Sequence, residues 1–381
     1  MDAVRIQQQV AAIATEWAAD RNKRQRRREL VAEDFDRLRE AGFLLTGVPV
    51  ELGGLWESTA ESTRAICEVL RVLAGGDSSV ALVSAMHPAV LSFWLASPEA
   101  PAAFAEPWRA QRSQVFESAR EGAWWGTITS EPGSGGDVAN TRTVARRPDG
   151  VGYSLTGQKH FGSGSGITSY MLTSGLAEGD AEPEWFFLDV RDVPWDGSKG
   201  MKLIAPWDGH GMTATQSHAF QFEDFPASRF AWSGAWRAIT EANGTFIGCA
   251  FTAVIVGIVQ TALEAARRQV QPRADSLREY ERLEWARADL EGWLINQAYE
   301  GMLRAVEHEP RPGSSVLRGK IAIAELAESV LSRICKVIGG GVYARQSPFG
   351  FWYEDVRALG FLRPPWGLAF DRLITDALTP A

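Results

Sequence analysis

Two glycine-rich segments, one shortly after the other, constrain this chain more than any other feature of its sequence. The first, SEPGSGGD, covers residues 130–137, and the second, GQKHFGSG, covers residues 157–164. Gly133, Gly135 and Gly136 lack a Cβ, so the backbone at these positions tolerates positive φ and lets a ligand approach closely. The two segments therefore predict a β-domain whose loops approach a ligand, with plain hairpin turns as the alternative use of the glycines.

Length and composition are those of a soluble protein with two or three domains. The chain has 381 residues, of which 45% are hydrophobic and 23% charged, enough for a well-buried core in each domain. Its net charge of −8 argues against nucleic acid as a partner, because phosphate binding needs clustered, unpaired Lys and Arg. The basic run RNKRQRRR at 21–28 is a local exception. We interpret it as a solvated helix face or connector, with a docking patch for an anionic ligand as the alternative.

The cysteines and the longest apolar run indicate a cytoplasmic protein without disulfides or membrane spans. Cys67, Cys249 and Cys335 are odd in number and show no CxxC spacing, which favours reduced thiols. The first residues lack the basic and apolar stretches of a signal peptide. Residues 245–263 are uncharged over a length that could cross a bilayer, but polar residues interrupt the run, so we expect a buried bundle helix. No cluster has metal-ligand spacing, so no metal site is expected.

The sequence pattern changes twice along the chain. Residues 1–122 show helical periodicity, residues 123–230 have the pattern of short strands between turns, and residues 231–381 return to helices. The strand-like runs predict a compact antiparallel β-domain with strands at 143–146, 153–156, 170–173, 185–190 and 217–222. Helical spacing predicts long helices at 58–73, 78–95, 234–272, 278–307, 314–338 and 366–378.

The two glycine-rich segments resemble TEPxxGSD and GxKxWITN, two motifs of the acyl-CoA dehydrogenase superfamily. Residues 207–227 resemble the strand that closes the family's β-domain, and residues 339–343 and 351–357 resemble its QxxGGxGY and RxxRDAR motifs. The resemblance implies an α+β acyl-CoA dehydrogenase fold with a helical N-terminal domain, a central β-domain and a C-terminal four-helix bundle. It also implies a flavoprotein that holds FAD or FMN and assembles as a homotetramer.

The same motifs imply which residues hold the flavin. By position, Ser130 and the preceding Thr129 meet the pyrimidine edge of the ring. Phe161 packs near the ring, and Ser163 hydrogen-bonds to its N5. The remaining residues implied in cofactor binding are Gly135 and Gly136 in the glycine turn and, towards the adenine half, Lys336, Gly339 and Gly340.

The chain departs from the family where a dehydrogenase needs its base. That enzyme removes an α-proton from a thioester with a carboxylate. The usual Glu position, eight residues past the RD of RxxRDAR, holds Arg363, and the other known position lies within residues 245–263, which contain no carboxylate. An always protonated Arg cannot act as this base. The RxxFG motif for the FAD pyrophosphate is replaced by VQPRA at 270–274, which makes FMN plausible beside FAD.

These departures resemble the oxygenase branch of the superfamily, which includes dibenzothiophene monooxygenase and two-component aromatic hydroxylases. That branch often has FxSG at the N5 position, as this chain does at 161–164, and a His on the N-terminal helices, which His87 matches. The catalytic candidates are His87, His210, Ser163 and Arg363. The branch implies a small-molecule substrate and a separate flavin reductase as partners. An acyl-CoA dehydrogenase with an unusually placed base and a non-catalytic acyl- or flavin-binding relative are the alternatives.

Overall fold

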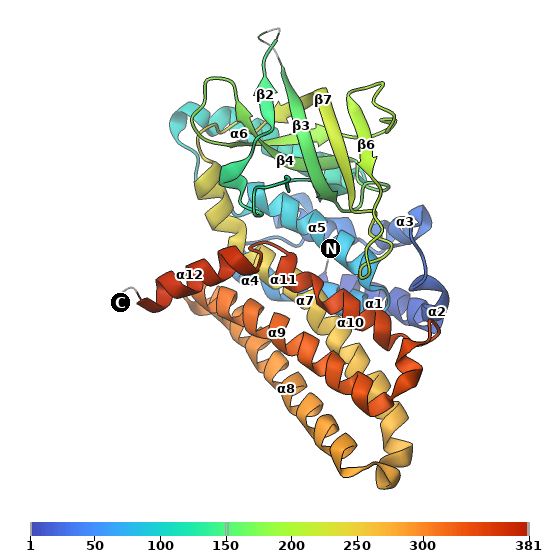
Figure 1. Cartoon of the computed structure of the whole chain (residues 1–381). Coiled ribbons are helices and arrows are strands. Elements are labelled where there is room, and N and C mark those ends of the chain that lie inside the picture. Colours follow the sequence, from blue (N-terminus) through green and yellow to red (C-terminus); the bar gives the residue numbers. More distant parts are fainter. Residues whose placement is uncertain (1, 149, 151, 379–381) are drawn as a thin grey trace.

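A helical layer, a β-domain and a long helical bundle make up the chain, in that order. The computed structural model describes residues 2–148, 150 and 152–378. Figure 1 shows the β-domain above the helices and the bundle extending away from it. The predicted α+β fold class is confirmed. The limits 1–122, 123–230 and 231–381 stay a prediction, and residues 1 and 379–381 at their outer ends lie outside the described residues.

Side-chain caps explain where two of the N-terminal helices, at 59–74 and 78–95, begin. The Ser58 hydroxyl accepts from the Glu61 N–H, and the Asp77 carboxylate accepts from the Val80 N–H, each satisfying an orphan donor of the first turn. Gly42 ends the third helix with a φ of 83°. The elements are α1 Ala3–Ala19, α2 Arg21–Arg24, α3 Ala32–Glu40, η1 Phe43–Gly47, η2 Val50–Leu52, α4 Thr59–Ala74, α5 Ser78–Leu95 and α6 Ala102–Arg120.

The central sheet closes on itself. Its strands are β1 Trp125–Thr127, β2 Val144–Arg146, β3 Tyr153–Gly162, β4 Tyr170–Ala177, β5 Glu184–Asp189, β6 Met201–Ala205 and β7 His218–Arg229, with η3 Val138–Asn140 before β2. They pair in the order β1-β4-β2-β3-β7-β5, β5 also pairs with β4, and β6 lies beside β7. The expectation of a purely antiparallel domain is wrong, because β4 pairs in parallel with both β1 and β2. Strand direction at such pairs depends on how distant segments meet, which alternation along one strand does not encode.

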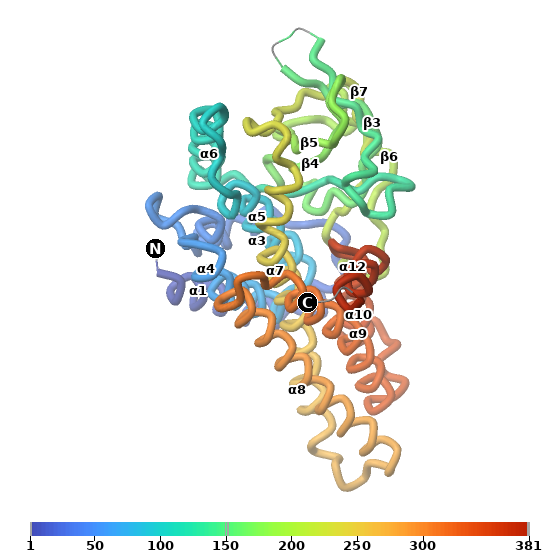
Figure 2. Tube along the Cα trace, turned by 90° about the vertical axis from the view of Figure 1, so that its left-hand side faces the viewer, coloured from blue at the N-terminus to red at the C-terminus, as the bar shows by residue number. Residues whose placement is uncertain are grey.

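The C-terminal bundle is built around one helix whose central part is buried. It comprises α7 Trp236–Val270, η4 Gln271–Ser276, α8 Glu279–His308, α9 Gly313–Ile338, η5 Gly340–Tyr343, α10 Phe349–Val356, α11 Ala358–Phe361 and α12 Trp366–Leu378. Figure 2 shows α7 running from the β-domain towards the far end of the bundle. Two helical stretches, Ser78–Leu95 and Trp236–Ser276, are long and apolar enough to cross a membrane, but 89% and 83% of their apolar windows are buried inside the fold. Residues 245–263 are thus a core helix, as expected.

Candidate flavin site

A buried ion pair joins the two glycine-rich segments. Lys159 Nζ, on β3, lies 2.5 Å from Glu131 Oε1, beside the glycine turn, and 2.6 Å from the Ser174 carbonyl. Glu131 also accepts from the Arg142 N–H at 2.6 Å. Burial alone would raise the pKa of Glu131, but the Lys159 ammonium and these donors hold it below its usual value. Burial lowers the pKa of Lys159 to about 8 against the opposing pull of Glu131, so both groups are charged at neutral pH.

The glycine turn has the backbone that its composition predicts. Gly133, Gly135 and Gly136 have φ of 75°, 63° and 81°, the left-handed region that side chains with a Cβ avoid. Open space surrounds the Cβ position of Gly135, whereas a Cβ on Gly136 would lie 2.9 Å from Pro365 Cγ. The turn is therefore open to a ligand on one side and covered by the segment before α12 on the other.

A bulge at the end of β3 turns one aromatic ring outward. The register of β3 against β7 shifts between Lys159 and Gly162, and Phe161 there has a φ of 57°. Its ring is 56% exposed and meets Trp207 edge-on, with the ring centroids 6.1 Å apart. Bulges re-aim side chains in this way. The His160 N–H donates to the Ser130 carbonyl at 2.8 Å, which brings the half-buried Thr129 and Ser130 beside this bulge.

Ser163 follows the bulge and is buried. Its Oγ lies 2.8 Å from Ser217 Oγ, and Ser217 Oγ lies 2.7 Å from Thr215 Oγ1. Thr215 and Ser217 belong to the β6–β7 loop, within the residues 207–227 that resemble the family's closing strand, but the sequence alone did not identify them as site residues. The open glycine backbone, the exposed Phe161 face and the buried hydroxyl fit a flat, heteroaromatic ring such as a flavin.

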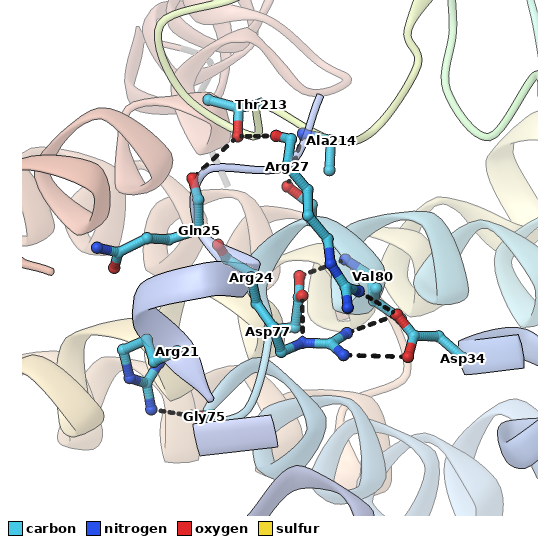
Figure 3. Close-up of polar contacts among 12 residues, drawn as sticks. Arg21, Arg24, Gln25, Arg27, Asp34, Gly75, Asp77, Val80, Thr213 and Ala214 are labelled. Atoms are coloured by element: carbon cyan, nitrogen blue, oxygen red, sulfur yellow. Dashed lines mark hydrogen bonds and ion pairs between the residues drawn. The ribbon is translucent and has the colours of Figure 1, made fainter. Parts of the chain in front are cut away.

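The arginine-rich run holds the β6–β7 loop in place. Arg24 is 5% exposed and bonds Asp34 and Asp77 at 2.7 and 2.9 Å (Figure 3). The expectation of a solvated face is wrong for Arg24, because its guanidinium group is buried and forms ion pairs with two buried carboxylates. From the β6–β7 loop, Thr213 Oγ1 donates to the Arg27 carbonyl at 3.0 Å (Figure 3).

Asp355 on α10 holds the same loop from the other side. Its carboxylate accepts from the Met212 N–H at 2.6 Å and from the Ser78 hydroxyl. Burial raises the pKa of Asp355 to about 6, although these two donors oppose the shift. The RxxRDAR-like motif thus supplies a buried carboxylate that fixes loop backbone.

Arg363 lies in the segment that covers the glycine turn. Its side chain is half-buried and makes no hydrogen bond to another residue of the described part of the chain. Burial lowers the pKa of Arg363 to about 10, while Asp137 and Glu131 oppose the shift. The buried Lys320 donates to the carbonyls on both sides, Leu362 at 2.8 Å and Pro364 at 2.5 Å. The Arg363 segment is therefore held from beneath by a cation.

The two candidate histidines occupy opposite environments. His87 is fully buried: its Nε2 lies 2.9 Å from the Leu44 carbonyl, and its Nδ1 accepts from the Trp125 N–H at 3.2 Å. This pattern fixes the neutral tautomer with the proton on Nε2. Burial lowers the pKa of His87 to about 4. His210 is exposed in the β6–β7 loop. His87 has both nitrogens engaged, whereas His210 remains available to solvent.

The residues expected near an adenine lie on the bundle. Lys336 Nζ, at the end of α9, lies 3.3 Å from Glu284 Oε2 on α8. Gly339 and Gly340 follow with open space at their Cβ positions. The VQPRA segment at the end of α7 borders a groove of about 440 Å³ with Arg267, Arg282 and Trp285. Their part in binding a cofactor stays a prediction.

Comparison with known proteins assigns the β-domain. The family model described as acyl-CoA dehydrogenase, middle domain, matches residues 126–225. This chain carries an acyl-CoA dehydrogenase middle domain. Dibenzothiophene monooxygenase of Mycolicibacterium goodii is 28% identical over 255 residues, 64% of this chain and 57% of that protein. Amino sugar nitrososynthase DnmZ of Streptomyces peucetius is 26% identical over 353 residues, 87% of this chain and 82% of that protein.

The acyl-CoA dehydrogenase fold extends beyond the middle domain. FMN-bound TdsC from Paenibacillus sp. A11-2 superimposes with a TM-score of 0.78 over 98% of this chain and 97% of that chain, at 18% sequence identity. The resemblance to the acyl-CoA dehydrogenase superfamily, and to its monooxygenase relatives in particular, is confirmed.

Proposed function

We propose that this acyl-CoA dehydrogenase-fold protein is a flavin-dependent monooxygenase that uses reduced flavin and O₂ on a small organic molecule. A separate flavin reductase supplies the reduced flavin. The sequence relatives include a dibenzothiophene monooxygenase and an amino sugar nitrososynthase, and TdsC, which has the same fold, binds FMN. The chain matches 57% of the first of these relatives, so the proposal rests equally on its own residues.

The residues around the bulge would hold the flavin. Thr129 and Ser130 would meet the pyrimidine edge, Phe161 would cover part of the ring, and Ser163 would contact N5. Gly135 and Gly136 leave room for the ring system to approach the backbone. The bound flavin supplies the electrons that activate O₂, and the protein's part is to orient the ring and exclude water from it.

The presence of Arg363 at the position of the dehydrogenase base is the observation that favours an oxygenase over a dehydrogenase. It occupies the segment above the glycine turn where a dehydrogenase would place its carboxylate, and it stays protonated. The second position for that base, within residues 245–263 of α7, has no Asp or Glu. Removal of an α-proton therefore has no base at either position. His210, exposed in the loop beside Trp207, is the proposed acid–base group, and His87 with its two hydrogen bonds positions η1 against β1.

The proposed flavin is FMN. The proposed assembly is a homotetramer, located in the cytoplasm. Lys336 is paired with Glu284, which leaves it less suited to meet an adenine. The outer face of α8 exposes five large apolar side chains that a neighbouring copy would cover, those of Tyr280, Leu283, Leu290, Trp293 and Leu294.

Anaerobic titration with reduced FMN and reduced FAD, followed by mixing with oxygenated buffer, tests the function. We expect tight binding of reduced FMN and a long-lived near-ultraviolet absorbance before oxidised flavin reappears. Immediate reoxidation, together with bleaching of bound oxidised FAD by an acyl-CoA, would instead identify a dehydrogenase whose base lies elsewhere.

A further inference from the structure

A row of three buried hydroxyl groups leads from the β6–β7 loop to Ser163. Thr215 Oγ1 donates to the Met212 carbonyl at 2.8 Å. Ser217 Oγ lies 2.7 Å from Thr215 Oγ1 and 2.8 Å from Ser163 Oγ. Thr215 is 0% exposed, Ser217 8% and Ser163 6%, so bulk water has little access to this row.

The proton count of these groups fixes the direction of every bond. A hydroxyl has one proton to donate, and a carbonyl has none. Because the Met212 carbonyl can only accept, Thr215 donates its one hydroxyl proton to that carbonyl. Thr215 must then accept a hydrogen bond from Ser217. Ser217 thus donates its own hydroxyl proton to Thr215, so it must accept a hydrogen bond from Ser163. Reversing any one bond would set two lone pairs against each other at hydrogen-bond distance.

Ser163 consequently turns a lone pair, and not a proton, away from the row. Reduced flavin carries a hydrogen on N5 and donates there, whereas oxidised flavin has a lone pair on N5 and needs a donor. We propose that Thr215 and Ser217 fix Ser163 as a hydrogen-bond acceptor and thereby make the site selective for reduced over oxidised flavin. This inference rests on the function proposed above, with Ser163 at N5.

Asp355 anchors the loop backbone at the far end of the row. Its carboxylate accepts from the Met212 N–H at 2.6 Å, on the same residue whose carbonyl terminates the row. This bond holds the Met212 backbone in place, and with it the carbonyl that accepts the Thr215 proton. The loop that carries the row is also held by Ser79, whose Oγ accepts from the Ala214 N–H at 3.2 Å. Thr215 and Ser217 are thus positioning residues acting through Ser163.

The test measures the dissociation constants of reduced and oxidised FMN anaerobically for the full-length protein and four variants. Ser217→Ala removes the hydroxyl that accepts the Ser163 proton. Thr215→Val removes the hydroxyl that accepts the Ser217 proton, which leaves Ser217 free to donate to Ser163. Thr215→Ser keeps the hydroxyl and serves as the rescue. Ser165→Ala removes a neighbouring buried hydroxyl that bonds only the Gly162 carbonyl among the described residues, and serves as the matched control.

For the wild type we expect reduced FMN to bind at least roughly tenfold more tightly than oxidised FMN. Ser163 accepts a hydrogen bond from N5 of the reduced form, whereas in the oxidised form two lone pairs face each other. Ser217→Ala and Thr215→Val should bring the ratio towards one, chiefly by strengthening oxidised FMN, while Thr215→Ser and Ser165→Ala keep the wild-type ratio. The midpoint potential of bound FMN should fall in parallel, by about 30 mV per tenfold change in the ratio.

The possible failures are distinguishable. A wild-type ratio near one, or a ratio that Ser217→Ala and Thr215→Val leave unchanged, overturns the inference and leaves the oxygenase proposal intact. No binding of either form of FMN or FAD by the wild type contradicts the proposed function, and the inference with it. The wild-type ratio needs no variant, so the test stands even where a substitution prevents folding.

Discussion

Lys159 Nζ lies 2.5 Å from Glu131 Oε1, and both side chains are buried beneath the turn that would receive the flavin. The pair connects β3 to the SEPGSGGD segment, so the shape of the site depends on a contact that is itself hidden from any ligand. Thr143 Oγ1 adds a hydrogen bond to Glu131 at 2.9 Å.

Lys159→Met should destabilise the protein strongly, because it leaves the Glu131 carboxylate buried without its cation. We expect a loss of about 3–5 kcal/mol in the free energy of unfolding. The double variant with Glu131→Gln should recover much of that loss, since neither charge then remains. Arg109→Met serves as the control: Arg109 is paired with Glu106 on the exposed face of α6, and its loss should cost less than about 1 kcal/mol. Denaturant unfolding measures all three, and a single variant as mild as the control would contradict the argument.

Asp355→Asn should change how stability depends on pH. The folded pKa of Asp355, about 6, lies above the 3.8 of a solvent-exposed aspartate, so the folded state binds the proton more readily. The stabilisation from this protonation is fully present below about pH 4 and is lost as the pH rises through about 6. Relative to Asp355→Asn, the wild type should therefore lose on the order of 2–3 kcal/mol between pH 4 and pH 7. Denaturant unfolding across this range gives the difference in the free energy of unfolding between the wild type and Asp355→Asn. A difference that does not change with pH would show that Asp355 does not titrate there.

Local sequence predicted the long elements well. The helix expected at 78–95 is found as Ser78–Leu95, because an apolar run follows a capping Asp77. The left-handed glycines of the turn and the outward Phe161 lie in the segments whose composition predicted a ligand-binding loop.

What the sequence could not predict depends on contacts between distant residues. Asp355 meets Met212 across 143 positions, and Ser163 meets Ser217 across 54, so no local pattern announces either bond. The Glu131–Lys159 pair left a signal, two charges within otherwise small and glycine-rich motifs, but its partners become evident only when β3 is placed beside the turn. The parallel pairing of β4 likewise appears only once the sheet closes.

Ser163→Ala should shorten the life of the oxygen-derived absorbance. The variant removes the acceptor proposed for flavin N5 and leaves a methyl group in its place. We expect the near-ultraviolet band to decay roughly tenfold faster, the kinetic equivalent of one lost hydrogen bond. Stopped-flow absorbance after mixing with O₂ measures the decay, with Ser165→Ala as the control. An unchanged decay would remove Ser163 from this role.

Leu290→Glu with Trp293→Glu should disrupt the proposed tetramer. Both side chains are 56% exposed on the outer face of α8, and burying two new carboxylates in an interface is costly. We expect a smaller particle by size exclusion with light scattering, with the circular dichroism unchanged. Ala103→Glu on the exposed face of α6 adds charge away from α8 and should leave the assembly intact. A wild-type protein that is already monomeric would contradict the tetramer itself.

Lys320→Met should loosen the segment that covers the glycine turn. Lys320 is 2% exposed and donates to the carbonyls of Leu362 and Pro364, and no carboxylate pairs with it among the described residues. Burial lowers the pKa of Lys320 to about 8, so it is mainly charged at pH 7. Methionine fills similar volume but leaves both carbonyls without their donor, at a cost of about 1–3 kcal/mol in the free energy of unfolding.

Because Pro365 packs on Gly136, we also expect reduced FMN to bind more weakly to Lys320→Met, roughly three- to tenfold, by anaerobic titration. Lys202→Met, on the exposed face of β6, is the control. A loss of stability with unchanged FMN affinity would show that Lys320 supports the fold and not the site.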